Sequence, residues 1–254
     1  SEDGSLSLRK ARHPLLERAL KKEGREIVPL TVTLTPEKHI LLISGPNAGG
    51  KSVCLKTTGL LQYMFQWGML IPTSESSELP VFDRILVSIG DDQSLENDLS
   101  TYSSFLFFSE SINSYILYFC DIDSSFLSDM KQMLSEADSR TLVLIDEFGS
   151  GTEPAAGGAI AEAILSELDS RGVRGVITTH YTNLKLYASA SECGVVNGAM
   201  LFDTEKMRPL YRLSVGHPGS SFAFEIAANI GFPEEVLRVA GEKVGGAMLN
   251  FEHQ

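Results

Sequence analysis

The stretch from Ile40 to Ser52 reads ILLISGPNAGGKS and decides the fold. Its first five residues predict a buried strand, and a glycine-rich loop follows and ends in Lys51 and Ser52. Glycines allow successive backbone N–H groups to turn inward around phosphate oxygens, and a helix predicted over Lys51–Trp67 adds its dipole. The alternative is a glycine-rich turn with an exposed lysine. The strand before the loop and the helix after it favour a phosphate-binding P-loop.

This loop predicts ATP and Mg²⁺ as ligands. Lys51 is expected to reach the β- and γ-phosphates, and the Ser52 hydroxyl is expected to bind Mg²⁺, which keeps water and phosphate oxygens as its other ligands. The residues of this loop that are predicted to bind the nucleotide are contiguous in the chain: Gly45, Pro46, Asn47, Ala48, Gly49, Gly50, Lys51, Ser52 and Val53.

A second strand, predicted over Thr141–Ile145, carries two carboxylates at its end. The run LVLIDE at Leu142–Glu147 buries four apolar residues and delivers Asp146 and Glu147 to the carboxyl end of the strand, where ligands bind in open α/β sheets. Asp146 is expected to hold Mg²⁺ through water, and Glu147 to orient or deprotonate the attacking water. Adjacent carboxylates could also be solvated or cap a loop, but the P-loop favours the catalytic interpretation.

Two further segments contain polar side chains of interest. Thr178, Thr179 and His180 end a strand predicted over Gly175–Thr179, and His180 could contact the γ-phosphate or the attacking water, although a histidine at a strand end is often structural. The segment Asp91–Ser104, DDQSLENDLSTYSS, could bind a phosphate before a helix, but its spacing alone favours a plain loop.

The remaining pattern predicts an α/β fold with a mostly parallel sheet flanked by helices. Further strands are predicted at Val28–Leu34, Ile85–Ile89, Val195–Phe202 and Arg208–Leu213, and further helices at Ala155–Arg171, Ser220–Ile230 and Pro233–Val244. The 254 residues are expected to form one ATPase domain over residues 12–244, with flexible segments at 1–11 and 245–254.

Composition limits the partners. The net charge is −12, and the 21 lysines and arginines form no basic run, so the chain is a poor DNA-binding surface by itself. Cys54, Cys120 and Cys193 form no CxxC pair, which suggests neither disulfides nor a zinc site and fits a reducing cytoplasm. The most apolar stretch, Phe105–Phe119, is too short and too polar to cross a membrane.

Taken in order, five motifs resemble the ATPase domain of the MutS family of DNA-repair proteins. They are GPNAGGKS, DDQSLENDLSTYSS, LVLIDEFGSGTEP, TTHYTNLK and GSSFAFEIAANIGFP. The resemblance spans about Arg12–Val244 and is stronger to the recombination-suppressing bacterial branch, MutS-two, than to the mismatch-recognising branch. A transporter ATPase is disfavoured because the LSGGQ signature is absent.

The resemblance implies an ABC-type P-loop ATPase in which two copies enclose two ATP molecules. It implies that Lys51, Glu147 and His180 act in hydrolysis, that Ser52 and Asp146 serve Mg²⁺, and that Ser100 reaches the partner's γ-phosphate. Adenine would pack near Ile27 and Val28. The implied protein is a cytoplasmic, DNA-associated bacterial homodimer that binds mismatched or branched DNA through regions outside this chain, with no membrane partner. A nuclease domain and a role on stalled ribosomes are also implied for the longer protein.

One segment departs from the family pattern. After Ser104 the chain reads FLFFSESINSYILYFCDIDSSF, so an extra segment lies near residues 105–126, and Phe126 stands where the family has histidine. This aromatic-rich segment could pack into the core, form a partner surface or stay disordered. Because it adjoins Ser100, it opens an alternative function, a nucleotide-gated dimerisation module that binds ATP but hydrolyses it poorly.

Overall fold

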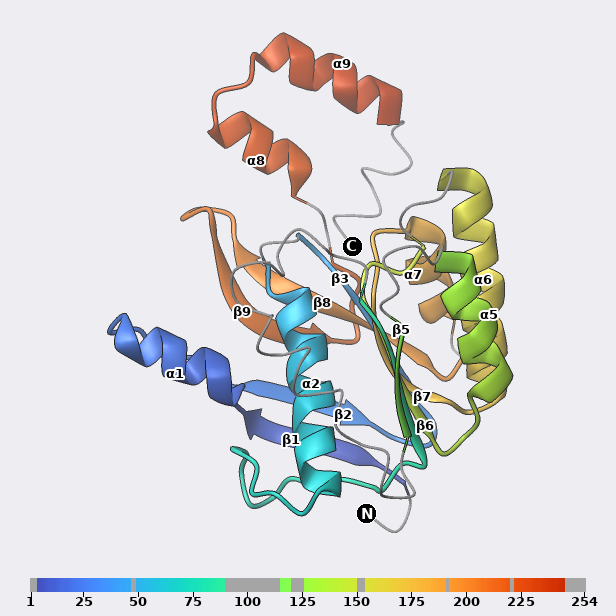
Figure 1. Cartoon of the computed structure of the whole chain (residues 1–254). Coiled ribbons are helices and arrows are strands. Elements are labelled where there is room, and N and C mark those ends of the chain that lie inside the picture. Colours follow the sequence, from blue (N-terminus) through green and yellow to red (C-terminus); the bar gives the residue numbers. More distant parts are fainter. Residues whose placement is uncertain are drawn as a thin grey trace.

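The computed structural model describes residues 4–46, 49–89, 115–119, 126–149, 154–190, 192–219 and 222–244. Its larger sheet has seven strands in the order β5-β4-β6-β7-β3-β8-β9. All neighbours from β5 to β8 are parallel, and β9 is antiparallel to β8 (Figure 1). The strands are β3 (Ile40–Ser44), β4 (Arg84–Ser88), β5 (Tyr115–Phe119), β6 (Thr141–Ile145), β7 (Arg174–Thr178), β8 (Val195–Asp203) and β9 (Arg208–Val215). The predicted mostly parallel α/β sheet is confirmed.

Hydrophobic cores cover both faces of this sheet. In β6, Leu142 and Leu144 pack into one core, whereas Val143 and Ile145 pack into the other, which explains the uninterrupted apolar run. One face is covered by α2 (Lys51–Gln66), and the opposite face by α5 (Phe126–Glu136), α6 (Pro154–Ser170) and α7 (Thr182–Ala188) (Figure 1). Helix α2 therefore starts at the carboxyl end of β3 and runs back along the sheet.

A small second sheet corrects one sequence-based expectation. Residues 1–11 were predicted to be flexible, but Leu6–Ala11 form strand β1, which pairs antiparallel with β2 (Leu30–Leu34). Leu6 and Leu8 are fully buried beside α2, and burial of their apolar surface stabilises this strand. The alternation Leu6-Ser7-Leu8 was the signal that could have predicted it. Helix α1 (Pro14–Lys22), also not predicted, connects the two strands.

The C-terminal helices α8 (Ala223–Asn229) and α9 (Glu234–Val244) form a helical hairpin. Both lie within the helices predicted from the sequence. They pack on each other and stand away from the sheet, beyond the carboxyl end of β3 (Figure 1). The chain enters this hairpin directly after β9, through residues 216–222. The predicted flexible tail at 245–254 lies outside the described residues.

Part of the extra segment belongs to the sheet. Its residues Tyr115–Phe119 form β5, which pairs in parallel with β4, and α5 begins at Phe126. Of the three alternatives for this segment, the strand excludes disorder for these five residues. The predicted polar segment Asp91–Ser104, with Ser100, lies outside the described residues. Among the helices that the structure describes, none has the length and apolar character needed to span a membrane.

Candidate functional site

The glycine-rich loop joins the buried strand β3 to α2, as predicted. Gly45 and Gly50 have φ angles of 124° and 93°, in the region that glycine adopts without steric cost, and Gly50 is the N-cap of α2. The N–H of Gly49 donates a 3.0 Å hydrogen bond to the carbonyl of Pro46, which tightens the turn. Asn47 and Ala48 lie outside the described residues.

Lys51 is almost completely buried, with 2% of its surface exposed. Its Nζ donates a 2.6 Å hydrogen bond to the carbonyl oxygen of Gly45, at the other end of the loop. Burial lowers the pKa of Lys51 to about 8, although the nearby carboxylates Asp146 and Glu147 oppose this change. The ammonium of Lys51 therefore bonds to the first residue of the loop and lies close to the carboxylates of Asp146 and Glu147.

Thr178 fixes the two carboxylate-bearing residues. Its hydroxyl donates a short hydrogen bond to Oδ1 of Asp146 and accepts a 2.8 Å bond from the N–H of Glu147. The N–H of Asp146 also donates to the carbonyl of Ser88 on β4, at 2.9 Å. Asp146 is 6% exposed, whereas Glu147 is partly exposed and has a φ of 53°. A non-glycine residue in this region is strained, and such strain is frequent at functional sites.

His180 follows β7 and keeps part of its ring in solvent. Partial burial and the positive charges of Lys51 and Lys185 lower the pKa of His180 below its ordinary value, while Asp146 opposes the change. The ring is therefore mainly neutral at pH 7, with one nitrogen that donates and one that accepts a hydrogen bond. The predicted residues Lys51, Asp146, Glu147 and His180 thus share one electrostatic site at adjacent strands β3, β7 and β6.

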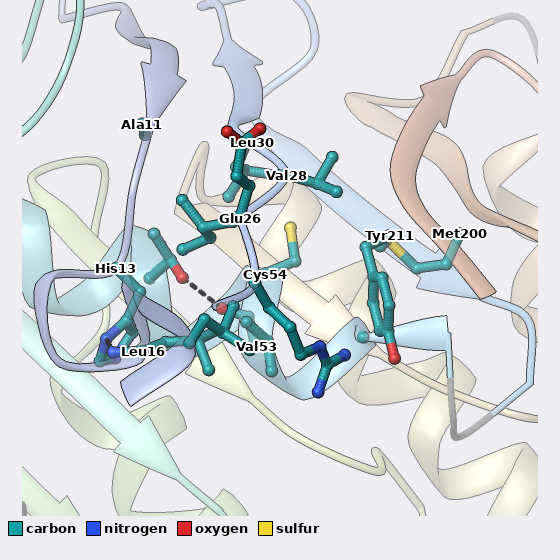
Figure 2. Close-up of a pocket in the computed structure, with 15 residues that line it drawn as sticks. Ala11, His13, Leu16, Glu26, Val28, Leu30, Val53, Cys54, Met200 and Tyr211 are labelled. Carbon is teal, nitrogen blue, oxygen red and sulfur yellow. Dashed lines mark hydrogen bonds between the residues drawn. The ribbon is translucent and has the colours of Figure 1, made fainter. Parts of the chain in front are cut away.

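A pocket of about 330 Å³ opens beside this loop. The predicted residues Ile27 and Val28 line it together with Gly50 and Val53, which places the start of α2 at its edge (Figure 2). The other lining residues come from β1, α1 and its N-cap, the segment before β2, the start of β2, α2 and the β8–β9 pair: Ala11, His13, Leu16, Leu20, Arg25, Glu26, Leu30, Cys54, Thr57, Met200 and Tyr211. The lining is mostly apolar, with polar groups at few points.

Tyr211 and Met200 form a wall that sequence reasoning missed. Figure 2 shows the two side chains together on one side of the pocket, opposite His13 and Leu16. A Cβ atom on Gly50 would lie 3.2 Å from the Tyr211 ring, so the ring reaches the glycine-rich loop. Tyr211 has a φ of 52° and lies where the register between β8 and β9 shifts. This irregularity, which the sequence does not signal, determines where the ring lies.

The N-terminal segment supplies the opposite wall. His13 is the N-cap of α1, where its Nδ1 accepts a 3.3 Å hydrogen bond from the N–H of Leu16. Burial is the main cause that lowers the pKa of His13. Because the restricted φ angle of proline suits the first residue of a helix, Pro14 could have indicated that a helix starts here. This wall depends on β1 and α1, neither of which was predicted.

Comparisons with known proteins relate the chain to one family. The family model described as MutS domain V matches residues 41–115 and 119–246. Proteins named Endonuclease MutS2 are 41% identical over 249 residues in Lachnospira eligens and 42% over 245 in Exiguobacterium sibiricum, covering 98% and 96% of this chain. A relative of the same name in Clostridium botulinum is 39% identical over 252 residues, or 99% of the chain.

In each case the chain spans 28% of the length of the relative it matches. The glycine-rich loop, the carboxylate-bearing strand β6 and the histidine after β7 all fall within the matched residues. The fold is accordingly that of a P-loop ATPase domain. The chain therefore belongs to the MutS family and corresponds to its domain V.

Proposed function

We propose that the chain binds and hydrolyses ATP and forms the ATPase part of a MutS-type DNA-repair or recombination-control protein. The observation that carries this proposal is the arrangement around Lys51. Its buried ammonium bridges the glycine-rich loop close to the carboxylates of Asp146 and Glu147, at the edge of an apolar pocket. An apolar pocket next to a cation and two acids fits a nucleotide with its base in the pocket and its phosphates at the loop.

The loop supplies the groups that phosphates require. The N-terminus of α2 and the glycine N–H groups of Gly45–Gly50 would receive the β-phosphate, and Lys51 would leave the carbonyl of Gly45 to contact the β- and γ-phosphates. The phosphates would then add negative charge beside the ammonium of Lys51, whose charged form Asp146 and Glu147 already favour. Val53, 42% exposed at the pocket edge, would contact the nucleoside.

The polar side chains also fit a magnesium ion that accompanies the phosphates. Asp146 is a nearly buried carboxylate fixed by Thr178, and Ser52 lies at the start of α2. Within the described residues, no three His, Cys, Asp or Glu side chains gather into a metal site. Ser52 and Asp146 would therefore hold Mg²⁺ mostly through phosphate oxygens and water, which is its usual environment, and the ion would supply charge neutralisation at the phosphates.

Hydrolysis would depend on Glu147 and His180. The Thr178 hydroxyl holds the strained backbone of Glu147 and so restricts the position of its side chain. The carboxylate would then orient and deprotonate a water molecule beside the γ-phosphate. A mainly neutral His180 could hold the same water or a γ-phosphate oxygen by a hydrogen bond. Lys51 and the bound ion would stabilise the charge on the transferred group.

The pocket favours a purine base. The flat ring of Tyr211 and the apolar side chains of Met200, Leu16 and Val28 would cover an aromatic ring on more than one side. The resemblance of the segment at Ile27 and Val28 to the family's adenine contact supports adenine rather than another base. The sequence-based proposal for adenine thus gains a concave site that adjoins the loop.

The rest of the function concerns a longer protein. The relatives are named endonucleases, and the chain spans 28% of their length, so nuclease activity and binding of mismatched or branched DNA would belong to regions beyond this domain. The domain would pair with a second copy, and ATP would be bound between the two. Ser100 of each copy would lie near the γ-phosphate bound by the other copy, and ATP would drive conformational change of the dimer. A cytoplasmic location and a ribosome partner remain parts of this proposal.

The test is Glu147→Gln, which removes the negative charge and keeps the size of the side chain. We expect the variant to bind ATP within about threefold of the unmutated affinity, while hydrolysis falls by at least about 100-fold. Turnover measured against protein concentration separates the alternative: the specific activity of the ATPase should rise as dimers form, whereas a nucleotide-gated module would bind ATP with turnover near zero. Unchanged hydrolysis by the variant would refute the assignment of Glu147.

A further inference from the structure

A short backbone contact ties the base of the C-terminal helical hairpin to the glycine-rich loop. Gly219 is buried, and its N–H donates a 2.7 Å hydrogen bond to Oγ of Ser44, the last residue of β3. A Cβ atom at position 219 would lie 2.6 Å from the carbonyl oxygen of Ser44 and 2.9 Å from the nitrogen of Gly45. Only glycine fits this close approach, so the backbone at Gly219 lies directly against the start of the loop.

Lys185 holds the other side of this contact. It lies on α7, five residues after His180, and its Nζ donates a 3.0 Å hydrogen bond to the carbonyl oxygen of Gly219. The same positive charge acts on the catalytic region, because it contributes to the lowered pKa values of Lys51 and His180. The charge of Lys185 therefore acts on Lys51 and His180, and its ammonium is hydrogen-bonded to the chain that leads into the hairpin.

The contacts of the hairpin within the described residues are mostly internal. Its helices α8 and α9 pack mainly on each other and stand away from the sheet (Figure 1). Close to its base, Phe222 stacks on Phe202 of β8, with ring centres 5.7 Å apart. The direction of the hairpin should therefore depend strongly on Phe222 and on residues 216–219, which include the contact made by Lys185.

We propose that Lys185 is a positioning residue that couples the γ-phosphate to the C-terminal helical hairpin through Gly219. This inference rests on the proposed function, because it requires a triphosphate at the loop. Without nucleotide, the like charges of Lys185 and Lys51 oppose each other, and we expect this repulsion to weaken the 3.0 Å hydrogen bond from Lys185 to Gly219. A triphosphate beside Lys51 screens the repulsion and strengthens that bond, so residues 216–219 are held more firmly than with ADP or with no nucleotide.

Hydrogen–deuterium exchange of the amides in Val215–Phe222 tests the link in the 254-residue chain without nucleotide, with ADP and with adenylyl-imidodiphosphate. In the unmutated chain, the triphosphate analogue should slow this exchange at least about threefold relative to ADP. In Lys185→Met, exchange without nucleotide should be about fivefold faster, and the difference between the two nucleotides should disappear. Lys185→Arg should restore both effects in part, because the donor and the charge remain.

A matched control is Lys38→Met. The Nζ of Lys38 also donates to a backbone carbonyl, that of Cys193 at 2.6 Å, and Lys38 precedes β3 at the end of the strand away from the loop. This variant should leave exchange at Val215–Phe222 unchanged. Equal exchange in Lys185→Met and the unmutated chain would refute the link.

Binding of the analogue, measured on the same samples, separates positioning from direct contact. Lys185→Met should lower affinity by no more than about tenfold. A loss as large as that of Lys51→Ala would overturn the proposal, because Lys185 would then be a phosphate ligand. If the unmutated chain bound neither nucleotide, the proposed function and the coupling would both be refuted. Faster exchange in Lys185→Met without nucleotide would then show only that Lys185 anchors Gly219.

Discussion

The proposed phosphate end of the site, which comprises the glycine-rich loop with Lys51 and the residues Asp146, Glu147 and His180, is built differently from the pocket beside it. The phosphate end uses three short segments that follow neighbouring parallel strands, β3, β7 and β6, so the sheet itself places Lys51, Asp146, Glu147 and His180. The pocket uses β1, α1, the segment before β2 and the β8–β9 pair, which come from distant parts of the chain. The first region contains most of the charged groups, so substitutions there should affect phosphate binding and hydrolysis. The second region is mostly apolar, so substitutions there should affect recognition of the base.

The largest effect should follow Lys51→Ala, at the phosphate end. Loss of the ammonium should weaken ATP binding by at least about 100-fold, because no other lysine bridges the loop within the described residues. Isothermal titration calorimetry measures this, with Lys38→Ala as a control that should bind like the unmutated chain. Because burial opposes the charged form of Lys51, the melting temperature without nucleotide should not fall. Unchanged ATP affinity would remove Lys51 from the phosphate site.

The next effect concerns how the two carboxylates are fixed. Thr178→Val removes the hydroxyl that bonds to Asp146 and Glu147, so kcat should fall about 10- to 50-fold, and the free energy of unfolding by about 1–3 kcal/mol. Steady-state hydrolysis and urea denaturation measure the two quantities. Thr179→Val is the matched control, because its buried hydroxyl donates instead to the carbonyl of Phe148. That variant should lose stability but keep kcat, and equal losses of kcat in both would contradict the role of Thr178.

These regions also differ in what the sequence could predict. The residues of the phosphate end are adjacent in the chain to strands with continuous apolar runs, so GPNAGGKS and LVLIDE predicted both the strands and the side chains at their ends. Tyr211 could not be found in this way, because its location depends on a shift in the pairing of β8 with β9. Lys185 belongs to the quoted motif TTHYTNLK, but its contact with Gly219 joins residues 34 positions apart. Local patterns do not report such contacts.

A third substitution, Tyr211→Ala, tests the base end separately from the phosphate end. Loss of the ring should weaken ATP binding about tenfold, while binding of inorganic tripolyphosphate should change less than about twofold, because that ligand has no base. Tyr211→Phe keeps the ring and should bind ATP almost normally. If Tyr211→Ala weakened both ligands equally, the ring would act by supporting Gly50 in the loop, and the assignment of the pocket to the base would be wrong.

The smallest expected effect is a dependence of ATP affinity on pH that comes from Lys51 alone. Its pKa in the folded chain is lowered from 10.5 to about 8, so the free chain loses this charge as the pH rises through that value. Since the phosphates favour the charged form, each ATP bound must then recruit a proton, and the affinity decreases with rising pH.

Between pH 7.5 and 8.5 the charged fraction of Lys51 falls about threefold, and the Kd for ATP should rise by the same factor. Lys51→Arg remains charged in this range, so its weaker affinity should be nearly constant with pH. A Kd that falls as the pH rises would show that the neutral form of Lys51 binds the nucleotide, and the arrangement around Lys51 would need another explanation.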